Sequence, residues 1–246
     1  MSLIVLVTGA RSGIGEATCR TLVAAGHRVI GTARDPQQLS DLAAELGDAF
    51  CPVGLDVDDP DAPAAMLEQL PADWRPVDVL VNNAGHDQGG RRHFAEGSAD
   101  EWCSVVETNV QGLIRVTHAV IADLGKQGRG HVVNLGSIAG LKPYATGTAY
   151  VTSKYAVHGF SDTLRLDYAG SGLRVTEIMP GLVRTGFAER RLGDAQAAGS
   201  FYDGFDACLR PEDVAEMIRF AIEAPAHVEV AQLVVLPVGR PESESS

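Results

Sequence analysis

The stretch Thr8-Gly9-Ala10-Arg11-Ser12-Gly13-Ile14-Gly15 joins a short apolar run, residues 3–7, to an amphipathic segment, residues 13–25. The run is continuous and rich in β-branched side chains, which predicts a strand buried on both faces. The segment stops before Gly26, as a helix commonly does. In a strand–turn–helix unit the first glycine permits a tight turn, the second lets the backbone approach a pyrophosphate, and the third allows close helix packing. The stretch therefore predicts a dinucleotide site, a purely structural turn being the alternative. Its predicted cofactor contacts are Gly9, Arg11, Ser12, Gly13, Ile14 and Gly15.

Strands and helices alternate along the rest of the chain. Apolar runs predict further strands at residues 28–33, 50–55, 77–81, 131–135, 174–178 and 233–236. Amphipathic segments predict helices at residues 36–46, 62–70, 99–124, 148–168 and 211–223. This alternation is typical of a parallel sheet with helices on both faces, which right-handed crossovers make doubly wound. We therefore expect an α/β Rossmann fold of about seven strands, in a single domain over residues 1–240.

Two segments interrupt the alternation. Residues 86–98 are polar and contain glycine, and residues 182–209 form a long stretch with charges and scattered aromatic side chains. In a doubly wound sheet, loops that follow the carboxyl ends of strands surround the ligand. Both segments are therefore predicted substrate loops. The last residues, 241–246, are predicted to be a disordered tail.

The composition of the 246-residue chain excludes several classes of protein. Hydrophobic residues make up 45% and charged residues 21%, which allows a substantial core. The net charge of −12 disfavours binding to nucleic acid or to an anionic membrane surface. No apolar run is long enough to cross a membrane, and residues 3–7 are too short for a signal peptide. The scattered cysteines predict free thiols in the cytoplasm and no metal site; they are Cys19, Cys51, Cys103 and Cys208.

Three side chains could perform acid–base chemistry. Ser137 follows a predicted strand, and Tyr150 and Lys154 lie four residues apart, on one face of a predicted helix. A phenol has a pKa near ~10 and is a poor base at neutral pH, but a neighbouring ammonium favours the phenolate. Tyr150 could then exchange a proton with an alcohol or carbonyl during hydride transfer, while Ser137 holds the substrate oxygen. On its own, a Tyr-x-x-x-Lys pair is more often an ordinary amphipathic helix face with a surface lysine.

The spacing of the glycine turn, Thr-Gly-x-x-x-Gly-Ile-Gly, resembles the fingerprint of the short-chain dehydrogenase/reductase family. Asn82-Asn83-Ala84-Gly85 resembles the second signature of that family, and the resemblance extends over residues 3–237. It implies the catalytic set Asn109, Ser137, Tyr150 and Lys154, in which Asn109 supports a water relay to the lysine. It also implies further cofactor contacts at Asp56, Val57, Asn83, Ala84, Gly85, Tyr150, Lys154, Pro180, Gly181, Val183 and Thr185.

The end of the second predicted strand favours NADP over NAD. NAD-dependent relatives normally carry an acid there, which pairs with the ribose hydroxyls. This chain has Ala33 and Arg34 instead, and a guanidinium can pair with a 2′-phosphate and stack on adenine. Arg11 is a second candidate cation. Asp35 argues against this choice because a carboxylate repels phosphate, and a solvated surface role for Arg34 is the alternative.

Residues 210–215, 225–230 and 236–238 read Arg-Pro-Glu-Asp-Val-Ala, Pro-Ala-His-Val-Glu-Val and Leu-Pro-Val. They resemble one branch of the family, the NADP-dependent 3-hydroxy acid dehydrogenases, also called serine or allo-threonine dehydrogenases. That branch implies a homotetramer that oxidises the 3-hydroxyl of small hydroxy acids or reduces the corresponding semialdehydes. The enzymatic alternatives are an enzyme that acts on an amino-alcohol/amino-ketone pair and a reductase of sulfoacetaldehyde or of a larger natural-product ketone. A nucleotide-sensing regulator is an alternative of another class, but it should have lost Tyr150 or Lys154.

Residues 86–94 depart from that branch, which is usually more apolar there. The charged or polar side chains in this stretch are His86, Asp87, Arg91, Arg92 and His93. They predict a different or more polar substrate, unless the stretch is only a surface flap.

The second substrate loop carries three arginines, Arg184, Arg190 and Arg191, in a protein of net charge −12. A guanidinium binds a carboxylate or sulfonate through two hydrogen bonds. We therefore predict that Arg191 binds the anionic end of the substrate, with Ser137 and Tyr150 at the reacting oxygen. The alternative is that these arginines pair with Glu189 and Asp194 on an exposed helix.

Overall fold

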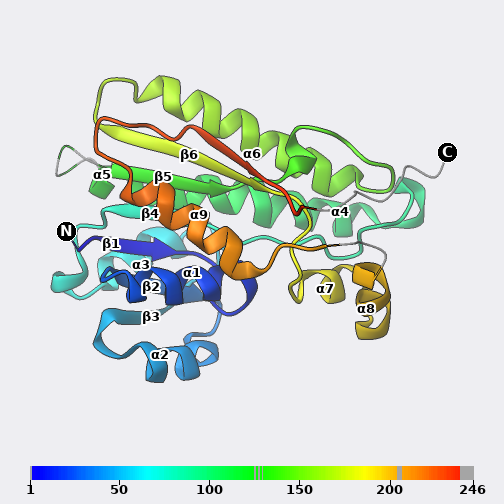
Figure 1. The fold of residues 1–246 in the computed structure, drawn as a ribbon, viewed down its shortest axis with the longest axis horizontal. Helices are drawn as coiled ribbons and strands as arrows, with labels where there is room; N and C mark the ends of the chain where they lie inside the picture. The colour runs from blue at the N-terminus through cyan, green and yellow to red at the C-terminus, as the bar shows by residue number, and fades with distance from the viewer. Residues whose placement is uncertain (1, 125, 127, 129, 204–206, 239–246) are drawn as a thin grey trace.

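Parallel strands form one central sheet in the order β3-β2-β1-β4-β5-β6-β7 (Figure 1). The computed structural model describes residues 2–124, 126, 128, 130–203 and 207–238. Within them the strands are β1 (Ile4–Val7), β2 (Arg28–Ala33), β3 (Phe50–Gly54), β4 (Val79–Asn82), β5 (Gly130–Leu135), β6 (Leu173–Pro180) and β7 (Gln232–Val235). The predicted doubly wound Rossmann sheet is confirmed.

Helices cover both faces of the sheet. They are α1 (Gly13–Ala24), α2 (Ser40–Leu46), α3 (Ala62–Gln69), α4 (Ala99–Val106), α5 (Leu113–Leu124), α6 (Thr148–Asp167), α7 (Phe187–Leu192), α8 (Ala195–Asp203) and α9 (Pro211–Glu223). One apolar cluster joins α1, α2 and α9 to the sheet through side chains such as Leu22 and Ile218. A second cluster joins α3, α5 and α6 to the opposite face through Met66, Val120 and Leu164.

The strand order reverses at β1, which lies between β2 and β4. At such a switch point the loops after neighbouring strands leave the sheet on opposite sides and open a crevice. The backbone N–H of Thr8 donates to the carbonyl of Val81 at 3.0 Å. This contact places the glycine turn, residues 8–15, directly beside residues 82–85.

Two of the predicted helices are each divided in the structure. Residues 36–46 begin with a tight 3₁₀ turn, Pro36–Leu39, because the side chain of Asp35 accepts a hydrogen bond from Gln37 N at 3.0 Å and caps that turn. Residues 99–124 contain a wider π-helical segment, Glu107–Gly112, between α4 and α5. Such π segments are frequent at functional sites, and this one contains Asn109.

The second predicted substrate loop, residues 182–209, contains two short helices, α7 and α8, which the sequence analysis did not predict. The six residues of α7 are too few to show a helical period. The two helices are stabilised by a small apolar cluster of Ala188, Ala198 and Tyr202, which only the folded chain assembles. The predicted tail, residues 241–246, lies outside the described residues.

Candidate active site

A cavity of about 920 Å³ opens at the carboxyl ends of the central strands. Its wall runs from Arg11 and Arg34 at one end to Tyr150 and Phe187 at the other. Every residue predicted from the sequence to bind cofactor or substrate, or to act in catalysis, lines this cavity, except Gly15. Gly15 lies behind the wall, where a Cβ would overlap the carbonyl oxygen of Gly9, so close packing explains this glycine.

The segment 82–85 supports the glycine turn through hydrogen bonds. The Asn83 side chain donates to the carbonyls of Thr8 and Gly9, at 2.8 and 3.1 Å. The hydroxyl of Thr8 accepts from the backbone N–H groups of Asn83 and Ala84, both at 3.0 Å. The backbone of Gly9 has φ = 68°, a left-handed conformation that favours glycine. The conformation of the turn is thus stabilised by Asn83, which lies 75 residues after Thr8 in the chain.

The cation-rich end of the cavity suits the phosphates of a dinucleotide. Within the described part of the chain, no carboxylate pairs with Arg11, Arg34 or Arg190, although the protein has a net charge of −12. Ser12 is the N-cap of α1, yet its side chain makes no capping hydrogen bond. Nη1 of Arg190 lies 3.5 Å from Ser12 Oγ. Free guanidinium groups beside an open helix N-terminus are donors that phosphate oxygens require.

The sequence suggested that Asp35 would oppose a phosphate, and its effect on one stays a prediction. Its carboxylate is turned to its own backbone, where it accepts from Gln37 N. Asp56, by contrast, lines the cavity, and its side chain accepts from Asp58 N at 3.1 Å.

Tyr150 and Lys154 lie one turn apart on α6, with the lysine Nζ 5.6 Å from the centre of the tyrosine ring. Lys154 Nζ donates to the carbonyl of Leu135 at 2.7 Å. Burial raises the pKa of Tyr150 to about 12, and the charge of Arg191 and a hydrogen bond with Ser137 oppose this rise. Burial lowers the pKa of Lys154 to about 8, whereas Glu177 and Asp87 act to raise it. Arg191, which the sequence assigned only to the substrate, is therefore also the main positive influence on the phenol.

Asn109 fixes the start of the first substrate loop. Its Oδ1 accepts from the backbone N–H of His86 at 2.8 Å, and its Nδ2 donates to the carbonyl of His86 at 2.9 Å. The same Nδ2 donates to Ser153 Oγ at 3.0 Å. The side chain thereby joins the π-helical segment to α6 and to the loop. The water relay that the resemblance implies for Asn109 stays a prediction.

The substrate end of the cavity contains an ion pair that sequence reasoning missed. Nε of Arg191 lies 2.6 Å from Oδ2 of Asp87, and the two side chains are only 11% and 2% exposed. The guanidinium carbon of Arg191 lies 5.4 Å from the ring centre of Tyr150 and 5.0 Å from that of Phe187. The two predicted substrate loops therefore meet directly above the candidate acid–base group. The polar stretch 86–94 pointed to Asp87 as a candidate residue, but the sequence did not show that Arg191 is its partner.

Two further side chains line this end of the cavity and were given no specific role from the sequence. The hydroxyl of Tyr144 is buried and has no hydrogen-bond partner among the described residues. Arg91 has a left-handed backbone, φ = 65°, and its guanidinium carbon lies 5.2 Å from the ring centres of both Tyr144 and Phe201. No sequence motif points to Tyr144, whereas Arg91 belongs to the polar stretch already noted.

In the residues that the structure describes, no cluster of three or more His, Cys, Asp or Glu side chains is arranged to hold a metal ion. No described helix combines the length and the apolar character needed to cross a membrane.

The chain is similar to known dehydrogenases along most of its length. The family model for short chain dehydrogenases matches residues 3–195. NADP-dependent 3-hydroxy acid dehydrogenase YdfG of Salmonella typhi is 42% identical over 238 residues, 96% of this chain and 95% of the relative. Serine 3-dehydrogenase of Agrobacterium fabrum is 40% identical over 241 residues, 98% of this chain and 96% of that protein. A solved structure of serine dehydrogenase, a closed form complexed with NADP+, matches this structure with a TM-score of 0.90 and is 39% identical in sequence. The match covers 95% of this chain and 94% of the serine dehydrogenase chain.

Proposed function

Because the chain belongs to the short-chain dehydrogenase family and is an NADP-dependent oxidoreductase acting on CH–OH groups, we propose that its substrate is a small anionic 3-hydroxy acid or the related semialdehyde. The observation that carries the proposal is the position of Arg191, whose guanidinium stacks over Tyr150. If Arg191 binds the substrate carboxylate, the substrate hydroxyl, which is a few bonds from that carboxylate, would lie beside Tyr150 and Ser137. The relatives named 3-hydroxy acid and serine dehydrogenases support the same substrate class.

The residues of the cavity divide into groups that would hold different parts of NADP. Arg11 and Arg34 suit the 2′-phosphate, and the glycine turn with Ser12 suits the pyrophosphate at the N-terminus of α1. Asp56 and Val57 suit the adenine end. The nicotinamide end is assigned to Pro180, Gly181, Val183 and Thr185. When bound, the cofactor supplies or accepts the hydride.

The remaining chemistry is a proton transfer at the substrate oxygen. In oxidation the phenolate oxygen of Tyr150 takes the proton from the substrate hydroxyl, and in reduction the phenol returns it to the carbonyl oxygen. Ser137 donates a hydrogen bond to that oxygen and fixes its position. Phe187 packs edge-on against Tyr150, with ring centres 5.7 Å apart, and limits access of water. Asp87 engages Nε of Arg191, which leaves the terminal nitrogens of the guanidinium for the substrate carboxylate.

A second candidate substrate is an amino alcohol or a hydroxy amino acid. Asp87 favours it, because its carboxylate can pair with the ammonium group of either molecule, and the neighbouring guanidinium of Arg191 can bind the carboxylate of a hydroxy amino acid. Sulfoacetaldehyde remains an alternative anion for Arg191. The homotetramer and the cytoplasmic location implied by the resemblance stay predictions, and light scattering after size-exclusion chromatography tests the former.

Absorbance at the reduced-nicotinamide band tests the proposal with a matched panel. The panel contains 3-hydroxy acids, their methyl esters, hydroxy amino acids and the corresponding amino alcohols. The proposal expects the acids to have the highest kcat/KM. Preference for the amino alcohols or the hydroxy amino acids would favour the second candidate. Equal rates on acids and esters would contradict the binding of a substrate carboxylate by Arg191.

Replacing Arg191 by Met should reduce kcat/KM about 10-fold on the acid, the low end of what hydrogen bonds to a charged group contribute. The low end applies because Asp87 already neutralises part of the guanidinium charge. The ester should lose little. Arg184→Met is the matched control, since Arg184 is an exposed arginine of the same loop that lies 3.9 Å from Asp203. Equal losses on acid and ester in Arg191→Met would exclude an anion-binding role.

A further inference from the structure

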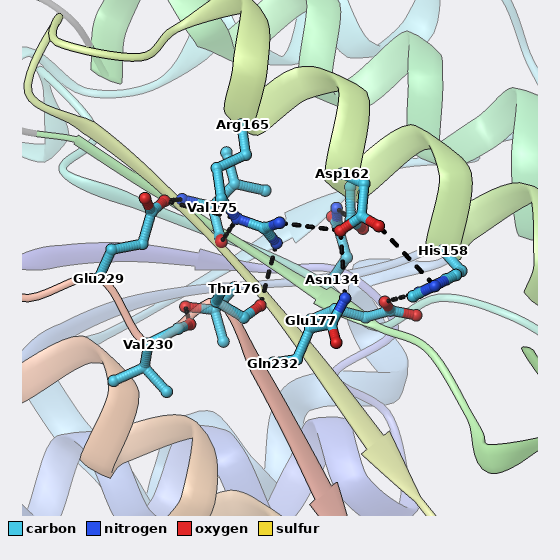
Figure 2. Close-up of polar contacts among 12 residues, drawn as sticks. Asn134, His158, Asp162, Arg165, Val175, Thr176, Glu177, Glu229, Val230 and Gln232 are labelled. Atoms are coloured by element: carbon cyan, nitrogen blue, oxygen red, sulfur yellow. Dashed lines mark hydrogen bonds and ion pairs between the residues drawn. The ribbon is translucent and has the colours of Figure 1, made fainter. Parts of the chain in front are cut away.

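One buried carboxylic acid, Glu177, contacts α6, the helix that carries Tyr150 and Lys154, and has no part in the chemistry described above. Glu177, near the end of β6, is 0% exposed. Its Oε2 lies 2.7 Å from Nδ1 of His158 on α6, as Figure 2 shows. Its Oε1 is buried and has no hydrogen-bond partner among the described residues. A buried carboxylate with one free oxygen is costly unless a nearby charge favours it.

Lys154 is a nearby charge that favours the ionised form of this carboxylate. The lysine Nζ donates to the carbonyl of Leu135, and a Cβ on the next residue, Gly136, would overlap Oε1 of Glu177. The ammonium and the carboxylate are therefore in contact with adjoining residues of one short backbone segment. Lys154 and His158 lie one turn apart on α6, so both face Glu177 from the same side.

Few other charges surround this pair. From α6, Asp162 lies 3.8 Å from Nε2 of His158 and is held by Arg165 at 2.8 Å. The strands on either side contribute neutral groups, Asn134 of β5 and Gln232 of β7, which are the register partners of Glu177. The Gln232 amide donates to Asp162 at 3.1 Å, away from the carboxylate of Glu177. On the cavity side, Asp87 is the other acid that acts on Lys154.

We propose that Glu177 is a positioning residue for Lys154: its carboxylate, kept ionised by His158, is the counter-charge that holds the lysine as an ammonium. The role of that ammonium beside Tyr150 rests on the proposed function, but the electrostatic pairing does not. Burial works against both charges, since it lowers the pKa of Lys154 and raises that of Glu177. The charge of Glu177 acts to raise the pKa of Lys154, and the charge of Lys154 acts to lower the pKa of Glu177. His158 adds a hydrogen bond that also lowers the pKa of Glu177.

The sign of the expected change follows from this arrangement. Glu177→Gln removes a negative charge that favours the ammonium, so the pKa of Lys154 should fall from about 8. Since an opposite charge typically shifts a pKa by 1–3 units, a fall of about one unit is expected through the intervening backbone. His158→Gln should act in the same direction, because a buried carboxylate without its partner becomes neutral. His158→Arg places a guanidinium beside Glu177, where it can donate to the carboxylate, and should preserve the pKa of Lys154.

Lysine-selective ¹³C labelling and NMR titration measure this directly, without cofactor or substrate. The chain has three lysines, Lys126, Lys142 and Lys154, so the spectrum is simple, and Lys154→Met assigns the buried one. Glu229→Gln is the matched control. Glu229 belongs to the same group of polar residues (Figure 2), but it accepts from Val175 N at 2.9 Å and does not act on Lys154.

Lys154 titrating at the parental pH in a folded Glu177→Gln protein would overturn the proposal, as would an equal shift in Glu229→Gln. If Glu177→Gln does not fold, the half-buried His158 provides the test through its Gln and Arg variants. In the reduction direction, the alkaline loss of kcat/KM that accompanies deprotonation of Lys154 should begin at a lower pH in Glu177→Gln than in the parent. A parent without NADP-dependent turnover would contradict the proposed function, while the NMR titration would still decide this inference.

Discussion

Tyr150→Phe should lower turnover by at least about 100-fold, the low end of what general acid–base catalysis contributes. The substitution keeps the ring, its contact with Phe187 and the packing of α6, and it removes only the hydroxyl that exchanges a proton with the substrate. Steady-state rates in both directions measure the loss. Turnover within a few-fold of the parent would show that Tyr150 is not the acid–base group.

Cofactor binding supplies the control for this variant. The residues proposed to bind the phosphates, Arg11, Arg34 and the glycine turn, belong to the segments after β1 and β2, whereas Tyr150 belongs to α6. The affinity for NADPH, measured by fluorescence, should therefore be retained in Tyr150→Phe. The direction of the pH dependence follows from the pKa of Tyr150, which burial raises to about 12. The phenol is therefore protonated at neutral pH and ready to donate in reduction. Oxidation requires the phenolate, so its rate should rise with pH.

Arg34→Ala should weaken NADP by about 10–150-fold, the range expected for a charge-assisted contact worth roughly 1.5–3 kcal/mol. NAD lacks the 2′-phosphate, so its affinity should hardly change. Arg34 lines the cavity, and no acid among the described residues competes for its guanidinium. Dissociation constants for both cofactors, measured by fluorescence titration, provide the test.

Arg190→Ala is the informative comparison. Nη1 of Arg190 lies 3.5 Å from Ser12 Oγ, beside the N-terminus of α1, where the pyrophosphate common to both cofactors is expected. This variant should weaken NAD and NADP by similar factors. A parent that prefers NAD, or an Arg34→Ala protein that still prefers NADP by the parental ratio, would contradict the assignment to Arg34.

Motifs within a few residues of one another were readable from the sequence. The strand–turn–helix unit at residues 3–25 depends on local glycine conformations and on a short apolar run, and the structure contains it at that place. The pair Tyr150 and Lys154 is separated by one helical turn, so its geometry follows once α6 forms. The alternation of strand and helix decided the parallel sheet, because parallel strands require crossover segments.

The electrostatic partners of these groups were decided only by the tertiary structure. Asp87 and Arg191 belong to loops that α4, α5, β5, α6 and β6 separate along the chain, and nothing in the sequence of either loop specifies the other. Glu177 reaches the neighbourhood of Lys154 because β6 pairs with β5 in a register that points its side chain at α6. The π-helical turn at Asn109 likewise depends on contacts with His86 and Ser153. The local periodicity of the sequence predicts which face of a helix or strand is buried. The packing of elements that are distant in the chain determines which charged side chains lie close together. Those contacts shift the pKa values on which the proposed chemistry depends.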